Sequence, residues 1–182
     1  MMQLGVLLIV SGLVGIDQLT KWLSIQFLRR SDPVSVINGF FSLTYTENRG
    51  AAWSMFEGQR WLLIGVTSAM LLTLLLVLLS GRFRRHRMAT FGGILVIAGG
   101  VGNLIDRVFR GFVVDFLQTD FIDFPIFNVA DCFVVIGAVL LFVYFVFFYS
   151  ETDSKRAKAP KEVAAQDVSD DTSDILDDGD KA

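Results

Sequence analysis

Four long apolar runs limit what this chain can fold into more than any other feature of its sequence. They cover residues 4–23, 61–79, 88–105 and 129–149. Each is close to the roughly 20 residues that an α-helix needs to cross the hydrocarbon core of a bilayer. Apolar residues make up 53% of the 182 residues and the mean hydropathy is +0.55, which is too high for a soluble domain of this length. The runs therefore predict an all-α membrane protein with four transmembrane helices.

The basic residues indicate how these helices are oriented. Short cytoplasmic loops of membrane proteins are enriched in lysine and arginine. The segment between the second and third runs holds Arg82, Arg84, Arg85 and Arg87. The segment after the fourth run holds Lys155, Arg156, Lys158 and Lys161. We therefore expect both segments and both termini in the cytoplasm, with residues 29–60 and 106–127 outside. The first run lacks a basic leader and an A-x-A cleavage site, so we expect a retained helix and not a signal peptide.

The segments outside the apolar runs predict smaller features. Residues 35–48 are rich in β-branched and aromatic side chains and have a turn signal at Asn38 and Gly39, which predicts a small extracytoplasmic β-sheet. We expect residues 51–56 to form a short surface helix. Residues 151–182 are acidic and contain no aromatic residue, which predicts a disordered cytoplasmic tail after one membrane domain of residues 1–150.

The third run is rich in glycine, and the whole chain is poor in soft metal ligands. Small residues allow membrane helices to approach closely, so we expect the third helix to pack against its neighbours. Its glycines are Gly92, Gly93, Gly99, Gly100 and Gly102. The single cysteine, Cys132, excludes an internal disulfide, the single histidine is His86, and no HExxH motif is present. We therefore expect no metal site and no cofactor.

The polar residues of the apolar regions all collect at one side of this topology. They lie in the outer half of the first helix, in the outer segments, and at the outer ends of the third and fourth helices. They are Asp17, Lys21, Asn48, Asn103, Asp106, Arg107, Asp115, Asn128 and Asp131. The helices cross the membrane in alternating directions, so proximity along the chain does not explain this clustering.

Most of these residues also have a purely structural interpretation. Asp17 and Lys21 are spaced i, i+4 and can form an ion pair on one helix face. Asn128 and Asp131 match a capping box at the start of a helix, where a carboxylate also suits the helix dipole. The segment from Asn103 can simply end a helix at the interface. Asp115 lies in the apolar stretch VVDF with neither a local cap nor an i, i+4 partner, and the combination therefore favours a functional site.

Two carboxylates that converge near a low-dielectric surface support a definite chemistry. Both cannot stay ionised cheaply at short range, so they can share one proton. The ionised carboxylate can then act as a general base on water, while the protonated one acts as a general acid. This is the apparatus of an aspartic protease, and Asp115 and Asp131 are the candidates for it.

At these residues the chain resembles lipoprotein signal peptidase, also called signal peptidase II. The resemblance extends over about residues 4–149 and rests on five blocks in the same order. They are DQLTK (17–21), NRGAAW (48–53), GNLIDR (102–107), VVDF (113–116) and FNVAD (127–131). Trp53 departs mildly from the family, in which phenylalanine is more usual at this position.

The resemblance implies a multi-pass aspartic endopeptidase of the bacterial inner membrane, with its active site near the extracytoplasmic face. Its substrates would be prolipoproteins, cut just before a cysteine that already carries diacylglycerol. Asp115 and Asp131 would be the catalytic pair. The supporting or substrate-binding residues would be Asp17, Lys21, Asn48, Gly50, Asn103, Asp106, Arg107 and Asn128. We expect membrane lipids as partners, no nucleic acid, and a monomer.

Three other functions stay open from the residues alone. A proton- or ion-coupled transporter could use Asp17, Asp115 and Asp131 as a relay, although its site should lie near the midplane of the membrane. A Mg²⁺-dependent lipid phosphotransferase could use Asp106 and Asp115 together with Asp120 and Asp123 as hard oxygen ligands. A non-enzymatic scaffold would explain the acidic tail but not Asp115.

Overall fold

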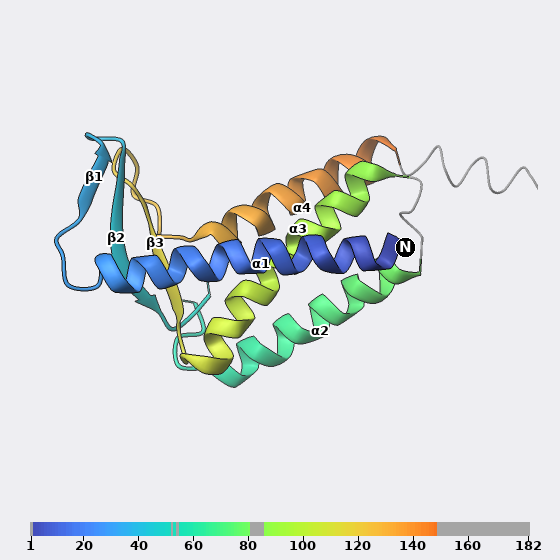
Figure 1. Cartoon of the computed structure of the whole chain (residues 1–182), viewed down its shortest axis with the longest axis horizontal. Coiled ribbons are helices and arrows are strands. Elements are labelled where there is room, and N and C mark those ends of the chain that lie inside the picture. The colour runs from blue at the N-terminus through green and yellow to red at the C-terminus, as the bar shows by residue number, and fades with distance from the viewer. Residues whose placement is uncertain (1, 52, 54, 81–85, 149–182) are drawn as a thin grey trace, which may run out of the picture. The chain divides into compact units, whose positions relative to one another are not determined.

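A computed structural model describes residues 2–51, 53, 55–80 and 86–148. In this part of the chain four helices are long and apolar enough to cross a membrane, which confirms the prediction from the apolar runs. They are α1 (Met2–Phe27), α2 (Arg60–Leu79), α3 (Arg87–Phe109) and α4 (Val129–Phe147). The strands β1 (Val34–Ile37), β2 (Phe41–Asn48) and β3 (Val113–Thr119) complete the described elements (Figure 1).

The helices α1 and α3 continue beyond the apolar runs that predicted them. The run of α3 was expected to end at residue 105, but the helix continues to Phe109. The end of the apolar run had placed Asn103 in the last turn of α3. In the structure Asn103 lies before the last turn, because the helix continues to Phe109. A helix does not need apolar side chains to continue when its exposed carbonyls find donors. Arg60 supplies them here, because its Nε donates to the carbonyl of Arg107 at 2.6 Å and its Nη2 to that of Val108 at 2.7 Å.

The strands form one antiparallel sheet in the order β1-β2-β3. The predicted turn between β1 and β2 is confirmed, with Gly39 at a φ of +70°. The strand β3 was not predicted, because its residues were assigned to an outer loop. It pairs with β2 over a long sequence distance, and the pairs include Thr46 with Asp115 and Asn48 with Val113. Because of this pairing, Asp115 lies in a strand and not in a free loop.

Three predictions concern residues that the structure describes only partly or not at all. The short surface helix expected over residues 51–56 includes residues 52 and 54, which lie outside the described part of the chain. Residues 55–58 form a turn there, and Trp53 and Phe56 have positive φ. Residues 81–85, which hold three of the loop arginines, and the tail of residues 151–182 also lie outside the described residues.

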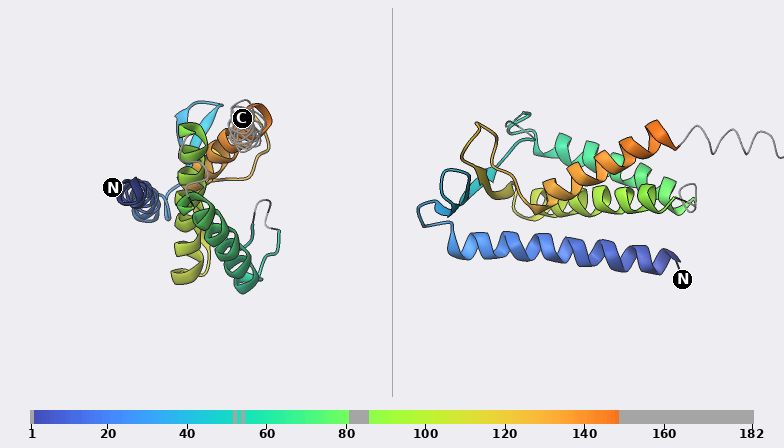
Figure 2. Two further views of the ribbon diagram at one scale, coloured as in Figure 1. Left: turned by 90° about the vertical axis from the view of Figure 1, so that its right-hand side faces the viewer. Right: turned by 90° about the horizontal axis from the view of Figure 1, so that it is seen from above.

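The helix α3 is the most buried of the four spans. Over half of its apolar window is buried inside the protein, whereas α1 and α2 expose almost all of theirs. Figure 2 shows α3 between α1 and α2, and both contact it. Glycines allow the close packing that the sequence predicted, because a Cβ on Gly92 would lie 3.0 Å from the carbonyl oxygen of Gly137 in α4.

The sheet lies at the end of the helices where α1 and α3 finish and α2 and α4 begin (Figure 1). The polar residues identified in the sequence come from these helix ends and from β2, β3 and the segments beside them. All of these belong to the compact unit Met1–Leu141. The fold therefore brings residues from distant parts of the sequence to one end of the helices, as the alternating topology predicted.

Candidate active site

The start of α4 carries the first of the two candidate carboxylates. The backbone N–H of Asp131 donates to Oδ1 of Asn128 at 3.0 Å, and the backbone N–H of Asn128 donates to Oδ2 of Asp131 at 3.1 Å. This reciprocal pair is the capping box that the sequence suggested. The cap leaves Oδ1 of Asp131 and the amide nitrogen of Asn128 available for other contacts. The structural and the functional interpretation of these two residues are therefore compatible.

Asp115 on β3 is buried, with 2% of its surface exposed. Its Oδ2 accepts a hydrogen bond from Nδ2 of Asn48 at 3.0 Å, and its Oδ1 accepts one from Nδ2 of Asn128 at 2.6 Å. The partners of Asp115 therefore come from β2 and from the start of α4. This explains why no local partner could be found in the sequence around it.

Asn103 on α3 connects the two carboxylates. Its Nδ2 donates to Oδ1 of Asp131 at 2.8 Å. Its Oδ1 accepts hydrogen bonds from Nδ2 of Asn128 at 3.2 Å and from Nζ of Lys21 at 2.8 Å. Asp115 and Asp131 are thus joined through two amide side chains.

The environment of Asp115 favours its protonated form. The pKa of this carboxyl is raised from 3.8 to about 6, mainly by burial and in second place by the negative charge of Asp131. The amide donors of Asn48 and Asn128 act in the opposite direction but are outweighed. A pair with one carboxyl of this kind can hold a single proton near neutral pH.

Asn48 is itself held by the segment that follows β2. The backbone N–H of Gly50 donates to Oδ1 of Asn48 at 2.9 Å, so the amide nitrogen of Asn48 faces Asp115. The carbonyl of Gly50 accepts a hydrogen bond from Nη2 of Arg107 at 3.0 Å. Arg107 on α3 therefore ties this segment to the site.

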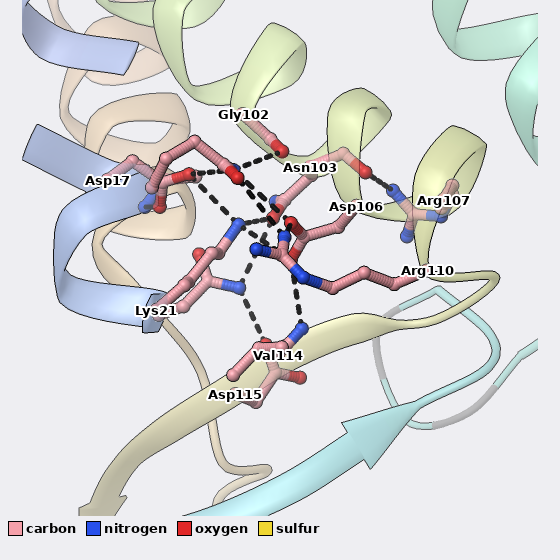
Figure 3. A network of polar contacts seen from close by, with 12 residues as sticks. Asp17, Lys21, Gly102, Asn103, Asp106, Arg107, Arg110, Val114 and Asp115 are labelled. Atoms are coloured by element: carbon pink, nitrogen blue, oxygen red, sulfur yellow. Dashed lines mark hydrogen bonds and ion pairs between the residues drawn. The ribbon is translucent and has the colours of Figure 1, made fainter. Parts of the chain in front are cut away.

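A second cluster of charges, drawn in Figure 3, is joined to Asn103 by the hydrogen bond from Lys21. Nζ of Lys21 lies 3.0 Å from Oδ2 of Asp17 and 3.3 Å from Oδ2 of Asp106, and all three side chains are fully buried. The predicted ion pair between Asp17 and Lys21 is confirmed, and Asp106 joins it.

Sequence reasoning missed two members of this charge cluster. Gln18 donates from Nε2 to Asp17 at 3.1 Å, to the carbonyl of Gly102 at 3.1 Å and to Asp106 at 3.2 Å. Arg110 forms an ion pair with Asp106 and donates to Oε1 of Gln18 at 3.1 Å. Arg110 could have been found from its i, i+4 spacing to Asp106, whereas Gln18 carried no comparable signal.

All ten predicted site residues thus belong to one connected network. A cavity of about 610 Å³ opens beside it. Its polar lining includes Asn48, Asn103, Arg107, Asp115 and Asp131. The rest is largely apolar and includes Trp53, Phe124, Phe127, Val134, Val135 and Ile136. The site therefore combines two carboxylates with an apolar surface.

The aspartates invoked for a magnesium site do not gather in this structure. Asp106 is paired with Lys21 and Arg110, and Asp120 accepts hydrogen bonds from Ser42 at 2.5 Å and Gln118 at 3.1 Å. Among the described residues, no group of three or more His, Cys, Asp or Glu side chains is arranged to hold a metal ion. The contacts of Asp106 and Asp120 disfavour the phosphotransferase alternative.

Comparison with known proteins points to one family. A family model described as signal peptidase (SPase) II matches residues 9–147. The lipoprotein signal peptidase of Enterococcus faecalis is 41% identical over 154 residues, which cover 85% of this chain and 92% of that protein. The lipoprotein signal peptidase of Clostridioides difficile is 41% identical over 146 residues, which cover 80% and 97%.

The fold is similar to that of a solved bacterial membrane enzyme. A solved structure described as a bacterial membrane enzyme, determined by the in meso method at 2.3 Å resolution, has a TM-score of 0.75 and 32% sequence identity. The similarity covers 81% of this chain and 90% of that one. The sequence match, the four membrane-spanning helices and this structural similarity agree. The chain therefore belongs to the signal peptidase II family and is a membrane-bound hydrolase.

Proposed function

We propose that this chain removes the signal peptides of prolipoproteins by using Asp115 and Asp131 as a catalytic pair of carboxylates. The observation that carries the proposal is the link between them: Asn128 and Asn103 join the two side chains at the wall of one cavity. Neither a serine nucleophile nor a metal ion is needed for this chemistry. Family membership supports the reaction, and the geometry supports the assignment of residues.

The proposed reaction starts with one proton shared by the pair. We assign this proton to Asp115, because burial raises the pKa of that carboxyl to about 6, and we assign the role of general base to Asp131. Asp131 takes a proton from a water molecule as the water oxygen attacks the scissile carbonyl carbon. Asp115 then gives its proton to the amide nitrogen, the C–N bond breaks, and the new carboxyl and amine ends leave. The pair is reset when Asp131 loses its proton and Asp115 regains one.

The apolar part of the cavity suits a lipid-modified substrate. Val134, Val135 and Ile136 line it from the first turns of α4, and Val135 and Ile136 also expose more than half of their surface. An acyl chain attached to the substrate can therefore contact this wall while it stays in the bilayer. We propose that a diacylglyceryl group on the cysteine after the scissile bond is recognised here.

The positive-inside rule supports an extracytoplasmic site. The arginines at positions 82, 84, 85 and 87 follow α2 and extend to the first residue of α3, and they favour a cytoplasmic location for this segment. The strands lie at the end of the helices opposite to where α2 ends and α3 begins. We therefore propose that the sheet and the two carboxylates are near the extracytoplasmic face and that both termini are cytoplasmic. One copy can suffice, because all ten network residues come from a single chain within residues 1–150.

The decisive experiment compares the purified wild type with Asp115→Asn and Asp131→Asn on a prolipoprotein substrate with and without diacylglycerol. Each variant should lose cleavage, because an amide keeps the shape of the side chain but cannot cycle a proton. EDTA should leave the wild type active, and the unlipidated substrate should be cut poorly. Asp120→Asn is the matched control, since Asp120 is exposed and lies outside the network, and it should stay active. Strong cleavage by either pair variant, or loss of activity with EDTA, would overturn the proposal.

A further inference from the structure

The ammonium group of Lys21 has a complete set of partners. Its three N–H donors face three acceptors, which are Oδ2 of Asp17 at 3.0 Å, Oδ2 of Asp106 at 3.3 Å and Oδ1 of Asn103 at 2.8 Å. The residue is fully buried and is not among the residues that line the cavity. Lys21 therefore lies too deep to bind a substrate in that cavity, and its charge acts on the protein itself.

The two carboxylates that Lys21 bridges each hold a particular backbone group. Oδ1 of Asp17 accepts the backbone N–H of Ala130 at 3.0 Å, and Oδ2 of Asp106 accepts the backbone N–H of Val114 at 3.0 Å. Ala130 directly precedes Asp131, and Val114 directly precedes Asp115. Each candidate catalytic aspartate is thus anchored one residue upstream by a buried carboxylate. Lys21 joins the two anchoring carboxylates, as Figure 3 shows for Asp17 and Asp106.

We propose that Lys21 is a positioning residue that sets the relative placement of Asp115 and Asp131. This inference rests on the proposed function of these two aspartates. The chain of contacts runs from Lys21 through Asp17 to the backbone before Asp131, and through Asp106 to the backbone before Asp115. A shift of either anchor moves one carboxylate relative to the other.

Lys21 also fixes the orientation of an amide in the site. An ammonium group can only donate hydrogen bonds, so it requires the oxygen of Asn103 to face it. The nitrogen of Asn103 must then point to Asp131, where it donates at 2.8 Å. Without Lys21, the oxygen of Asn103 keeps only the longer hydrogen bond from Asn128 at 3.2 Å, so the orientation in which its nitrogen donates to Asp131 is held less firmly. Lys21 therefore acts on Asp131 in two ways, through Asp17 and the backbone of Ala130 and through the amide of Asn103. Both depend on the hydrogen bonds of Lys21 as well as on its charge.

Charge balance offers a competing, purely structural explanation. The buried cluster contains Asp17 and Asp106 against Lys21 and Arg110, so Lys21→Met leaves one negative charge uncompensated. The double variant Lys21→Met with Asp17→Asn restores the balance and removes the bridge. The double variant separates charge balance from positioning, because it recovers the charge balance of the cluster but does not recover the contacts that position the two aspartates.

The test measures kcat, KM and thermal stability of purified full-length variants on the lipidated substrate. The charge-balanced double variant should fold, keep KM within about twofold and lose about 100-fold in kcat, the loss expected when a reacting group moves by about 1 Å. Asp17→Asn keeps an oxygen for the N–H of Ala130 but weakens the bridge, so its kcat should fall about tenfold with KM unchanged. Arg29→Met is the control, because its ion pair with Glu47 is exposed, and it should behave as the wild type.

The pH dependence of kcat gives a second measurement, which would not change if Lys21 only stabilised the fold. The charged groups that face the pair are Lys21 from α1 and Asp106 and Arg107 from α3, and Cys132 from α4 is the titratable thiol beside Asp131. Removal of the positive charge in Lys21→Met should move the limbs of the kcat profile to higher pH by about one unit. Arg29→Met should leave the limbs in place.

Each outcome decides the question. A wild-type kcat in the double variant or in Asp17→Asn would overturn the inference, as would a raised KM with kcat unchanged. Because Asp17→Asn retains Lys21 and the Asp106 pair, it provides an answer even if the double variant does not fold. Failure of the catalytic pair itself is recognised separately, because Asp115→Asn or Asp131→Asn would then remain active.

Discussion

The buried carboxyl of Asp115 should make the stability of this protein depend on pH, and Asp115→Asn should remove that dependence. The pKa of Asp115 is about 6 in the folded chain against 3.8 for the free side chain. At about 1.4 kcal/mol per pKa unit, this difference corresponds to about 3 kcal/mol. The side chain is only 2% exposed, so solvent screens little of this cost.

The sign follows from proton binding. The folded state binds the proton of Asp115 more tightly than the unfolded state, so this contribution to stability is fully present below pH 3.8. It is lost as the pH rises through about 6. Between pH 5 and pH 8 the wild type should lose about 1.4 kcal/mol that Asp115→Asn retains. An amide at this position places one N–H₂ group against Asn48 or Asn128, which costs about 1–3 kcal/mol at every pH.

The slope with pH, and not the absolute stability, is therefore the quantity to measure. Thermal unfolding of the purified proteins in detergent at pH 5 and pH 8 should show the wild-type Tm falling by about 3–6 °C more than that of Asp115→Asn. Asp131→Asn should show an intermediate slope, because it removes the second cause of the raised pKa but leaves burial unchanged. Parallel Tm curves for the wild type and Asp115→Asn would refute the reasoning.

Three further predictions concern activity, packing and topology. The value of kcat/KM should fall about tenfold per pH unit above about pH 6, as Asp115 loses the proton it must donate, and a flat profile from pH 5 to pH 8 would contradict this role. Gly102→Val should abolish cleavage, because even a Cβ there would contact Oδ2 of Asp17 and lie 3.0 Å from its Cγ, whereas a Cβ at Gly65 in α2 would meet no atom within 4 Å, so Gly65→Val should stay active. Reporter fusions should report the cytoplasm after residues 81 and 150 and the outside after residue 58; an external signal at residue 81 would reverse the proposed orientation.

The helices and the convergence of the candidate site residues could be predicted from the sequence, because both depend on patterns along the chain. Each apolar run is long enough to define a span by itself. Once the spans alternate in direction, the ends of α1 and α3 and the starts of α2 and α4 must meet on one side. Asp17, Asn103 and Asp131 are therefore placed together by topology alone, without any knowledge of packing.

The features that could not be predicted depend on contacts between distant residues. The strand β3 forms because Val113 and its neighbours pair with β2, and the residues VVDF alone do not indicate that β2 is their partner. The end of α3 was placed too early because hydropathy marks the apolar part of a helix and not its last hydrogen bond. The anchors of Val114 and Ala130 were also missed, because they are backbone donors and have no signature in the sequence.

The network also explains how one orientation of its amide side chains is selected. An asparagine can present either oxygen or nitrogen, so a chain of three could in principle adopt several arrangements. Here each amide meets a group that can only donate. Lys21 donates to the amide oxygen of Asn103. The backbone N–H of Asp131 donates to the amide oxygen of Asn128, and the backbone N–H of Gly50 donates to the amide oxygen of Asn48. All three nitrogens are consequently directed at the carboxylates, with Asn48 and Asn128 donating to Asp115 and Asn103 to Asp131. The two acids are thus held by donors whose direction is fixed before any substrate arrives, which is the preorganisation that acid–base chemistry in a buried site requires.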